Sequence, residues 1–120
     1  MKLADIVNRV IVDPRKLTDY ALDPESPWGH HKAKVFKESL GFTKENYADL
    51  LAQIEEKALE GEATFHSEDE FGRRYTVDLS IQGTEGQEAI VRTGWLVPPG
   101  AHEARLITLY VKSPSSEEVR

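Results

Sequence analysis

Hydrophobic residues change their spacing near the middle of this 120-residue chain. In the first half they recur every three or four positions, the spacing of a helix that buries one face. From residue 63 onward they alternate with polar residues, as in strands that bury one side. Because the helical and extended segments are segregated along the chain, the pattern predicts an α+β fold.

Three helices are predicted in the first half, each opening on a residue whose side chain can cap free backbone N–H groups: residues 13–22, 26–41 and 43–61. The first opens on Asp13 and Pro14, and proline suits the first helical position. The second ends at Gly41, since glycine readily adopts the left-handed conformation after a last turn. Ahead of these helices, the β-branched run 10–12 fits either an edge strand or an extended lead-in.

The second predicted helix carries both a clear apolar stripe and most of the candidate chemistry. Its buried stripe is expected to consist of Ala33, Phe36 and Leu40. Lys34 and Lys37 fall on a face that is expected to lie in water. Lys32 falls at the border of the apolar stripe, where its stem can pack while its ammonium group reaches a neighbouring element.

Four strands are predicted in the second half: residues 63–67, 75–81, 88–97 and 104–112. The glycine-containing turn at residues 84–86 favours a tight hairpin, whose register places Asp78 opposite Arg92. The strand over residues 88–97 is apolar on both faces, which places it in the middle of the sheet.

The last strand completes the predicted architecture. Alternation puts Ile107 on the face covered by helices and Leu106 on the opposite face with Tyr110. The result is three N-terminal helices packed on a four-stranded antiparallel meander, an α+β domain over residues 1–112. Residues 113–120 are expected to form a mobile polar tail.

Composition narrows the class of protein. The chain has no cysteine, which excludes disulfides, zinc sites built on thiolates and cysteine nucleophiles. No run resembles a secretory leader or a membrane span, so a cytoplasmic protein without a membrane partner is expected. The net charge of −6 is the sum of +2 for residues 1–44 (8 basic, 6 acidic) and −8 for residues 45–120 (7 basic, 15 acidic). An acidic chain is a poor candidate for avid non-specific nucleic-acid binding, and only the N-terminal half leaves room for a local basic face.

A first cluster of candidate chemistry is Gly29-His30-His31-Lys32, which offers an acid, a base and a phosphate contact. Histidine is the residue type that titrates nearest neutrality. Adjacent helical residues point about 100° apart, so only one of the two histidines is expected to face a given site. The pair lacks the four-residue spacing of helical metal ligands, and no metal or other cofactor is expected.

A second cluster shares the less apolar face of the predicted sheet: Asp78, Arg92, Thr108 and Tyr110. An arginine can hold a phosphate through two bonds, and tyrosine and threonine hydroxyls can donate hydrogen bonds or pass protons. The same residues also fit a structural interpretation. In that case Asp78 and Arg92 form a cross-strand ion pair, and Tyr110 packs over Leu106.

An ordered set of segments supports a broader interpretation: residues 12–14, 16–20, 22, 29–36, 40–42, 92–97 and 105–110. With these motifs the chain resembles a family of small bacterial domains that occur alone or at the C-terminal tips of polymorphic toxins. That family is similar to the RelE and colicin-nuclease-like group of metal-independent ribonucleases. The resemblance covers nearly the whole domain and implies N-terminal helices on a four-stranded antiparallel sheet.

The resemblance implies catalytic roles for His31, Lys32, Arg92, Thr108 and Tyr110. A ribose 2′-OH would attack the adjacent phosphate, with His31 or Tyr110 in proton transfer. Lys32 and Arg92 would stabilise the phosphate charge. RNA and a cognate antitoxin or immunity protein are the implied partners.

Two features depart from that family pattern. Gly94 stands where a β-branched residue is expected, and the gap it leaves is predicted to loosen the strand or admit a ligand. The net acidic charge also differs from the basic surface usual in such nucleases. The alternative function is therefore a non-catalytic binding module, an immunity or partner-binding protein that presents its acidic second half to a basic partner.

Overall fold

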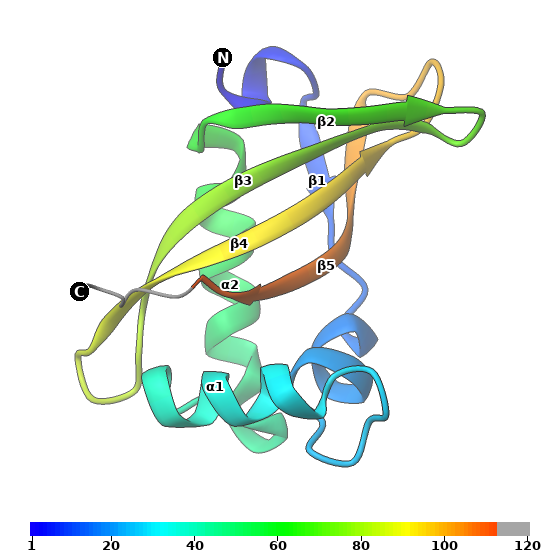
Figure 1. The fold of residues 1–120 in the computed structure, drawn as a ribbon. Helices are drawn as coiled ribbons and strands as arrows, with labels where there is room; N and C mark the ends of the chain where they lie inside the picture. Colours follow the sequence, from blue (N-terminus) through cyan, green and yellow to red (C-terminus); the bar gives the residue numbers. More distant parts are fainter. Residues whose placement is uncertain (113–120) are drawn as a thin grey trace, which may run out of the picture.

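A five-stranded sheet is the framework of the computed structural model, which describes residues 1–112 (Figure 1). Its strands are β1 (Arg9–Ile11), β2 (Ala63–Asp69), β3 (Gly72–Gln82), β4 (Glu88–Val97) and β5 (Glu103–Val111). They lie in the order β1-β5-β4-β3-β2. Two helices of eleven residues accompany the sheet, α1 (His30–Leu40) and α2 (Tyr47–Lys57). The predicted tail, residues 113–120, lies outside the described residues.

The prediction of a four-stranded antiparallel sheet is wrong. Strands β2 to β5 form the expected meander, but β1 pairs with β5 as a fifth, parallel strand and makes the sheet mixed. Arg9 lies opposite Glu103, and the two side chains form an ion pair of 2.7 Å. A strand of three residues shows no periodicity, and these partners are 94 positions apart, so the alternation of residues could not assign it to the sheet.

The prediction of three N-terminal helices is also wrong. The first, residues 13–22, is reduced to the five-residue η2 (Leu17–Ala21). This turn is wide, since the N–H of Leu22 bonds to the carbonyl of Leu17, five residues back. The expected cap is present, because the Asp13 carboxylate accepts a bond from the backbone N–H two residues on. A cap predicts where a helix begins, whereas tertiary packing decides how far it runs.

The third predicted helix, residues 43–61, is divided. It begins as η3 (Lys44–Asn46), continues as α2 and ends as η4 (Ala58–Glu60). Thr43 opens it as expected, because its N–H donates to the Asn46 side chain and its hydroxyl accepts from the backbone of the first turn. Among residues 1–112 no helix has the length and hydropathy needed to cross a membrane.

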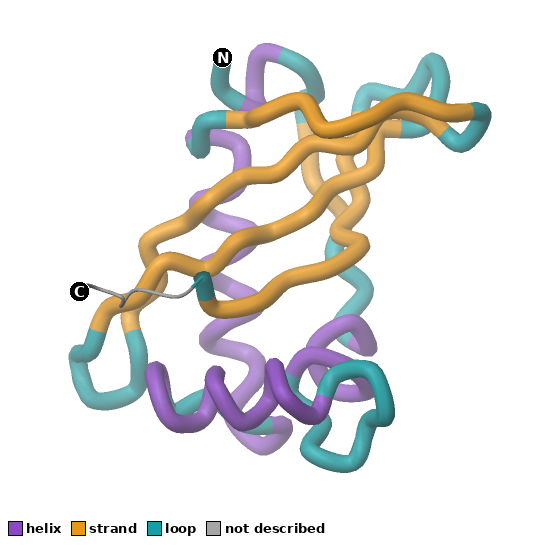
Figure 2. Tube along the Cα trace, in the orientation of Figure 1, coloured by secondary structure: helices purple, strands orange, loops and turns teal. Residues whose placement is uncertain are grey.

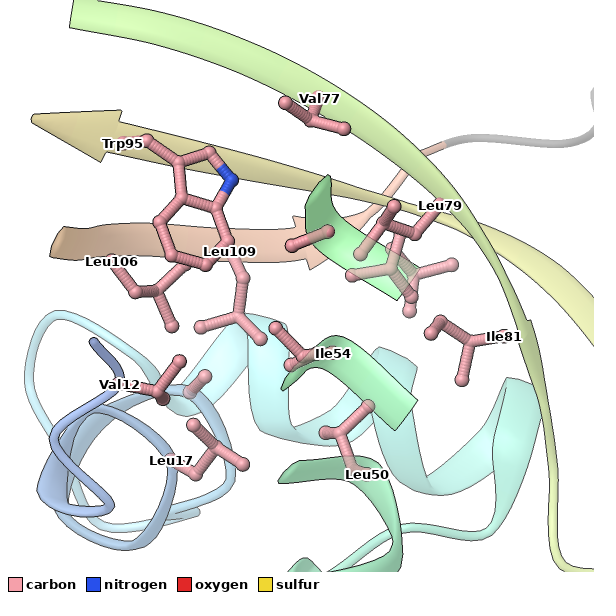
Figure 3. Close-up of a cluster of buried hydrophobic side chains, with 14 of the residues drawn as sticks. Val12, Leu17, Leu50, Ile54, Val77, Leu79, Ile81, Trp95, Leu106 and Leu109 are labelled. Carbon is pink, nitrogen blue, oxygen red and sulfur yellow. The ribbon is translucent and has the colours of Figure 1, made fainter. Parts of the chain in front are cut away.

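The core lies between the helices and one face of the sheet, and α2 runs behind the strands in the view of Figure 2. The four positions predicted to face the helices are at most 3% exposed: Val77, Leu79, Val91 and Leu109. Trp95 is the largest fully buried side chain and lies in the same cluster (Figure 3). Its Nε1 donates to the Thr93 hydroxyl over 2.7 Å, and Thr93 donates to the backbone carbonyl of Val77. Thr93 is therefore a core residue whose polar atoms are satisfied within the sheet.

The helical face of α1 is as predicted. Ala33, Phe36 and Leu40 are buried, while Lys34 and Lys37 are exposed. The helix ends at Gly41, which has a φ of 78° and so takes the left-handed conformation expected of it. The apolar stripe thus orients α1, and this orientation decides where its polar side chains point.

The β3–β4 hairpin confirms the predicted register. Asp78 lies opposite Arg92, and Val77 lies opposite Thr93. The turn uses Gly86 at a φ of 82°, the left-handed position that a short hairpin loop requires. Because side chains alternate between faces, this register commits Asp78 and Arg92 to the face away from the helices.

Strand β5 departs from strict alternation. Gly94 pairs with Thr108 and the next residue, Trp95, pairs with Leu106, so Ile107 is left over as a β-bulge. Leu106 is therefore only 3% exposed and packs in the core near Leu109 (Figure 3), contrary to the prediction that it faces outward. Ile107 was predicted to be buried and is instead half-buried. Leu106 and Ile107 are both apolar, so the sequence gave no sign of which of the two faces the core.

The stripe on α1 gives a test of packing. We expect Phe36→Ala to lower the free energy of unfolding by about 3–5 kcal/mol, because the side chain is fully buried. Lys34→Ala should change it by less than about 0.5 kcal/mol, because that side chain lies in water. Denaturant unfolding of both variants measures the difference, and equal losses would contradict the assigned helical face.

Candidate functional site

The face of the sheet away from the helices carries one polar row across three strands. Asp78 on β3 lies opposite Arg92 on β4, which lies opposite Tyr110 on β5. The neighbouring row pairs Gly94 with Thr108. The sheet register therefore brings together the three sheet residues proposed for catalysis, on one face of adjacent strands.

Lys32 reaches this face from α1. Its Nζ donates to the Thr108 hydroxyl over 3.0 Å and also to the hydroxyl of Tyr20, in η2. The same ammonium group lies 4.5 Å from the centroid of the Tyr20 ring and 5.6 Å from that of the Tyr110 ring. Half-buried lysines are stabilised by such bonds and by aromatic faces. Lys32 thus connects α1, η2 and β5, as its border position predicted.

Tyr20 is the functional candidate that the sequence reasoning missed. Burial raises the pKa of its hydroxyl, but hydrogen bonds with Lys32 and Thr108 and the charges of Lys32 and Lys16 outweigh burial, so the pKa lies below its ordinary value. Helical spacing made Tyr20 look like an ordinary core residue. The one available signal was Lys32 itself, because an ammonium group at an apolar border needs a polar partner.

Arg92 is held by an acidic partner. Its Nε and Nη2 donate to the two oxygens of Asp78 over 2.8 and 3.0 Å, and Lys112 donates to the same carboxylate over 3.2 Å. Arg92, with help from Lys112, holds the pKa of the Asp78 carboxyl below its usual value despite partial burial. The carboxylate in turn raises the pKa of Arg92, and Tyr110 adds to this shift.

The structural interpretation of this cluster is thus half right. The Asp78–Arg92 ion pair is confirmed, but Tyr110 does not pack over Leu106, which faces the core. Two cations share one carboxylate, so the Asp78, Arg92 and Lys112 group carries a net positive charge. These side chains are partly exposed, so solvent weakens the effect of their charge. Arg92, which carries part of the charge, lies opposite Tyr110 on the neighbouring strand.

The two histidines face different hollows. His31 is exposed and lines a shallow hollow of about 390 Å³ together with Lys32, Val35, Tyr110 and Val111. The ring of His30 lies 4.1 Å from that of His31 but lines another hollow, and its Nδ1 lies 3.0 Å from the backbone carbonyl of Ser26. Only His31 therefore shares a surface with Lys32, in line with the expected angle between adjacent helical residues.

A larger hollow, of about 480 Å³, lies on the other side of Tyr20. Its lining combines charged side chains with the bulged residue of β5: Asp13, Arg15, Lys16, Asp19, Tyr20 and Ile107. Tyr20 lines this hollow, and its partner Lys32 lines the hollow that contains His31. A ligand bound at the Lys32–Tyr20 contact therefore has a hollow beside each of the two residues.

Gly94 does not leave the gap predicted from the sequence. A Cβ built at this position would lie 2.8 Å from Cγ2 of Thr108 and 3.6 Å from Cγ1 of Ile107. The side chain of Thr108 therefore occupies the space over Gly94. Since Thr108 is β-branched, a larger residue at position 94 would force it to rotate and disturb its bond to Lys32.

The Lys32–Tyr20 contact can be tested by titration. The ionisation of Tyr20 should move to higher pH in Lys32→Met, because burial would then raise its pKa without the opposing charge. Ultraviolet absorbance of tyrosinate, followed against pH in both proteins, measures this. Because the native pKa of Tyr20 lies below its ordinary value, ionisation of Tyr20 adds stability as pH rises through that native pKa, and this addition is complete above about 10. The added stability is lost again as pH falls through the native pKa. Identical titration curves would contradict the contact.

The fold has a solved counterpart. A chain of the contact-dependent growth inhibition toxin–immunity protein complex from Klebsiella pneumoniae 342 superposes on it with a TM-score of 0.66 and 16% sequence identity. The alignment covers 88% of this chain and 95% of that one. At this identity the similarity shows the fold alone. No curated protein matches the sequence significantly.

The sequence also matches a family model over nearly its whole described length. The match spans residues 2–113, so it includes η2, both helices and all five strands. The set of residues that surrounds Lys32 lies entirely within it. The chain therefore belongs to the family of domains of unknown function DUF6883.

Proposed function

We propose that this domain is a toxin of the ribonuclease type, which cleaves RNA without a metal ion through attack of a ribose 2′-OH on the adjacent phosphate. The observation that carries the proposal is the convergence of Lys32, Thr108 and Tyr110, with Arg92 beside them, on one open face. These are groups of the kind that stabilise phosphate charge and move protons. The fold shared with a chain of a toxin–immunity complex agrees with this class of protein.

Both cations keep free donors for a phosphate. An ammonium group has three N–H donors, and Lys32 uses two of them on Tyr20 and Thr108. A guanidinium group has five, and Arg92 uses two on Asp78. The bonds already made fix the direction of the remaining donors, which is the preorganisation that electrostatic catalysis needs.

The reaction assigns one role to each group. His31 removes the proton from the 2′-OH, whose oxygen bonds to phosphorus while the bond from phosphorus to the 5′-oxygen breaks. The leaving oxygen takes a proton from the hydroxyl of Tyr110 or from water. Lys32 and Arg92 stabilise the additional negative charge on the phosphate, and Thr108 and Tyr20 are positioning residues for Lys32. The products are a 2′,3′-cyclic phosphate and a 5′-hydroxyl.

The test uses total bacterial RNA, which contains every cellular RNA that such a toxin meets in the cytoplasm. We expect the purified protein to cleave it in the presence of a chelator and to leave 2′,3′-cyclic phosphate ends. Lys32→Ala and Arg92→Ala should each lower the rate by roughly 10²-fold or more, because each removes charge stabilisation from the transition state.

Matched variants separate this effect from general loss of charge. Lys37→Ala removes an exposed lysine from another face of α1, and Arg73→Ala removes an arginine of β3 that faces Glu68 instead. Both should keep the wild-type rate, and circular dichroism should show all four variants folded. Absence of cleavage, or cleavage that survives in Lys32→Ala and Arg92→Ala, would exclude the proposed chemistry.

A second candidate function is a non-catalytic partner-binding module, such as an immunity protein. Residues 45–120 carry 7 basic and 15 acidic side chains, a net charge of −8, and a basic partner would suit that half. An inactive protein that forms a stable complex with a basic toxin would support this function. In the ribonuclease case, the partner would instead be an antitoxin or immunity protein that covers the Lys32 face.

A further inference from the structure

Trp28 is the most exposed large hydrophobic side chain among residues 1–112, with 82% of its surface accessible. Its position differs sharply from that of Trp95, the other tryptophan of the chain, which is 0% exposed. An indole ring that is buried against a partner contributes strongly to binding, because it removes a large apolar area from water. An indole ring left in water contributes nothing of this kind.

The backbone around Trp28 is held in place. The Ser26 hydroxyl, nearly buried, accepts bonds from the N–H groups of Trp28 and Gly29 over 3.3 and 3.1 Å. Gly29 packs against the backbone of Tyr20, since a Cβ at this position would lie 2.0 Å from the Tyr20 carbonyl oxygen. The loop that presents Trp28 is thus attached to the residue that binds Lys32, and its ring is presented with little loss of backbone entropy.

Trp28 also lies near Lys32 through the packing of its neighbour. It stands in the turn that leads into α1, four residues before Lys32. The next residue, Gly29, packs on the backbone of Tyr20, and the Tyr20 hydroxyl accepts a bond from Lys32. A short single strand that contacts Trp28 is therefore within reach of the Lys32 ammonium group.

The charge around Trp28 fits an anion. Residues 26–37 contain no acidic residue, in a chain whose net charge is −6, and His31 and Lys32 among them line one hollow with Tyr110. An aromatic ring amid cations is the combination with which proteins bind single-stranded nucleic acid, through stacked bases and neutralised phosphates. An apolar protein partner would have no use for the cations.

We propose that Trp28 is a platform on which an unpaired RNA base stacks, while the phosphate next to that base lies at Lys32. The inference rests on the proposed function of the Lys32 face and adds the substrate class: single-stranded or looped RNA rather than a continuous duplex. In a duplex both faces of each base are already stacked, so no base is free to cover the indole.

The test measures binding separately from cleavage. A short single-stranded 2′-O-methyl oligoribonucleotide lacks the attacking hydroxyl, so it binds without being cut. We expect it to quench the fluorescence of the wild-type protein but not that of Trp28→Phe, which retains only the buried Trp95. Trp28→Leu should weaken binding by roughly 5- to 150-fold, measured by fluorescence anisotropy of a labelled oligonucleotide. Trp28→Phe should keep most of the affinity, because phenylalanine also stacks.

Phe71→Leu is the matched control, since Phe71 is also an exposed aromatic residue, at 62%, but lies in the turn between β2 and β3. It should leave the affinity unchanged. An oligonucleotide of the same length without bases, and a blunt duplex, should bind the wild-type protein as weakly as the single strand binds Trp28→Leu. Equal affinity for all three nucleic acids would overturn the stacking proposal.

The outcomes separate this inference from the proposed function. Cleavage of RNA with the same kcat/KM and affinity in Trp28→Leu would overturn the platform and leave the ribonuclease in place. Binding that depends on Trp28 without any cleavage would keep the platform and reject the ribonuclease. A protein partner that needs Trp28, with RNA affinity unaffected by its loss, would assign the residue to a protein interface and overturn the inference.

Discussion

One ammonium group connects the helices of this domain to its sheet. Lys32 belongs to α1, and its two hydroxyl partners belong to η2 and β5. A half-buried charge is tolerated only where its donors find acceptors, so α1 must lie at a fixed height over β5. The apolar stripe of α1 supplies the packing energy. Packing alone would allow α1 to rotate slightly about its axis, and the directional bonds of Lys32 prevent this rotation. The placement of His31 and of the loop before α1 follows from this constraint.

The acidic chain and its basic face are compatible because the charges are unevenly placed. Net charge describes long-range steering and non-specific adhesion, whereas a bound phosphate responds to the nearest few groups. On the face away from the helices, Arg92 and Lys112 share the single carboxylate of Asp78 and leave an excess positive charge. An overall acidic protein with such a face would discriminate against random polyanions and favour those that also fit its shape.

The sequence predicted features set by local geometry and missed those set by distant contacts. The register of Asp78 and Arg92 followed from one glycine turn between two alternating strands, and it was right. Strand β1 is too short to show a period and pairs with the other end of the chain, so it was not assigned to the sheet. The bulge at Ile107 could not be predicted because Leu106 and Ile107 are both apolar and either could face the core. Five of the proposed site residues were singled out from the sequence and its resemblance, whereas Tyr20 was recognised only from the structure.

The site depends on Gly94, although this residue has no side chain that could contact a ligand. Cγ2 of Thr108 lies 2.8 Å from the place that a Cβ at position 94 would take, and the hydroxyl of that same side chain accepts a bond from Lys32. Positions 94, 108 and 32 therefore form an epistatic triplet across β4, β5 and α1. A methyl group gained on β4 would alter which residues are tolerated on α1, so homologues of this domain should change these three positions together or not at all.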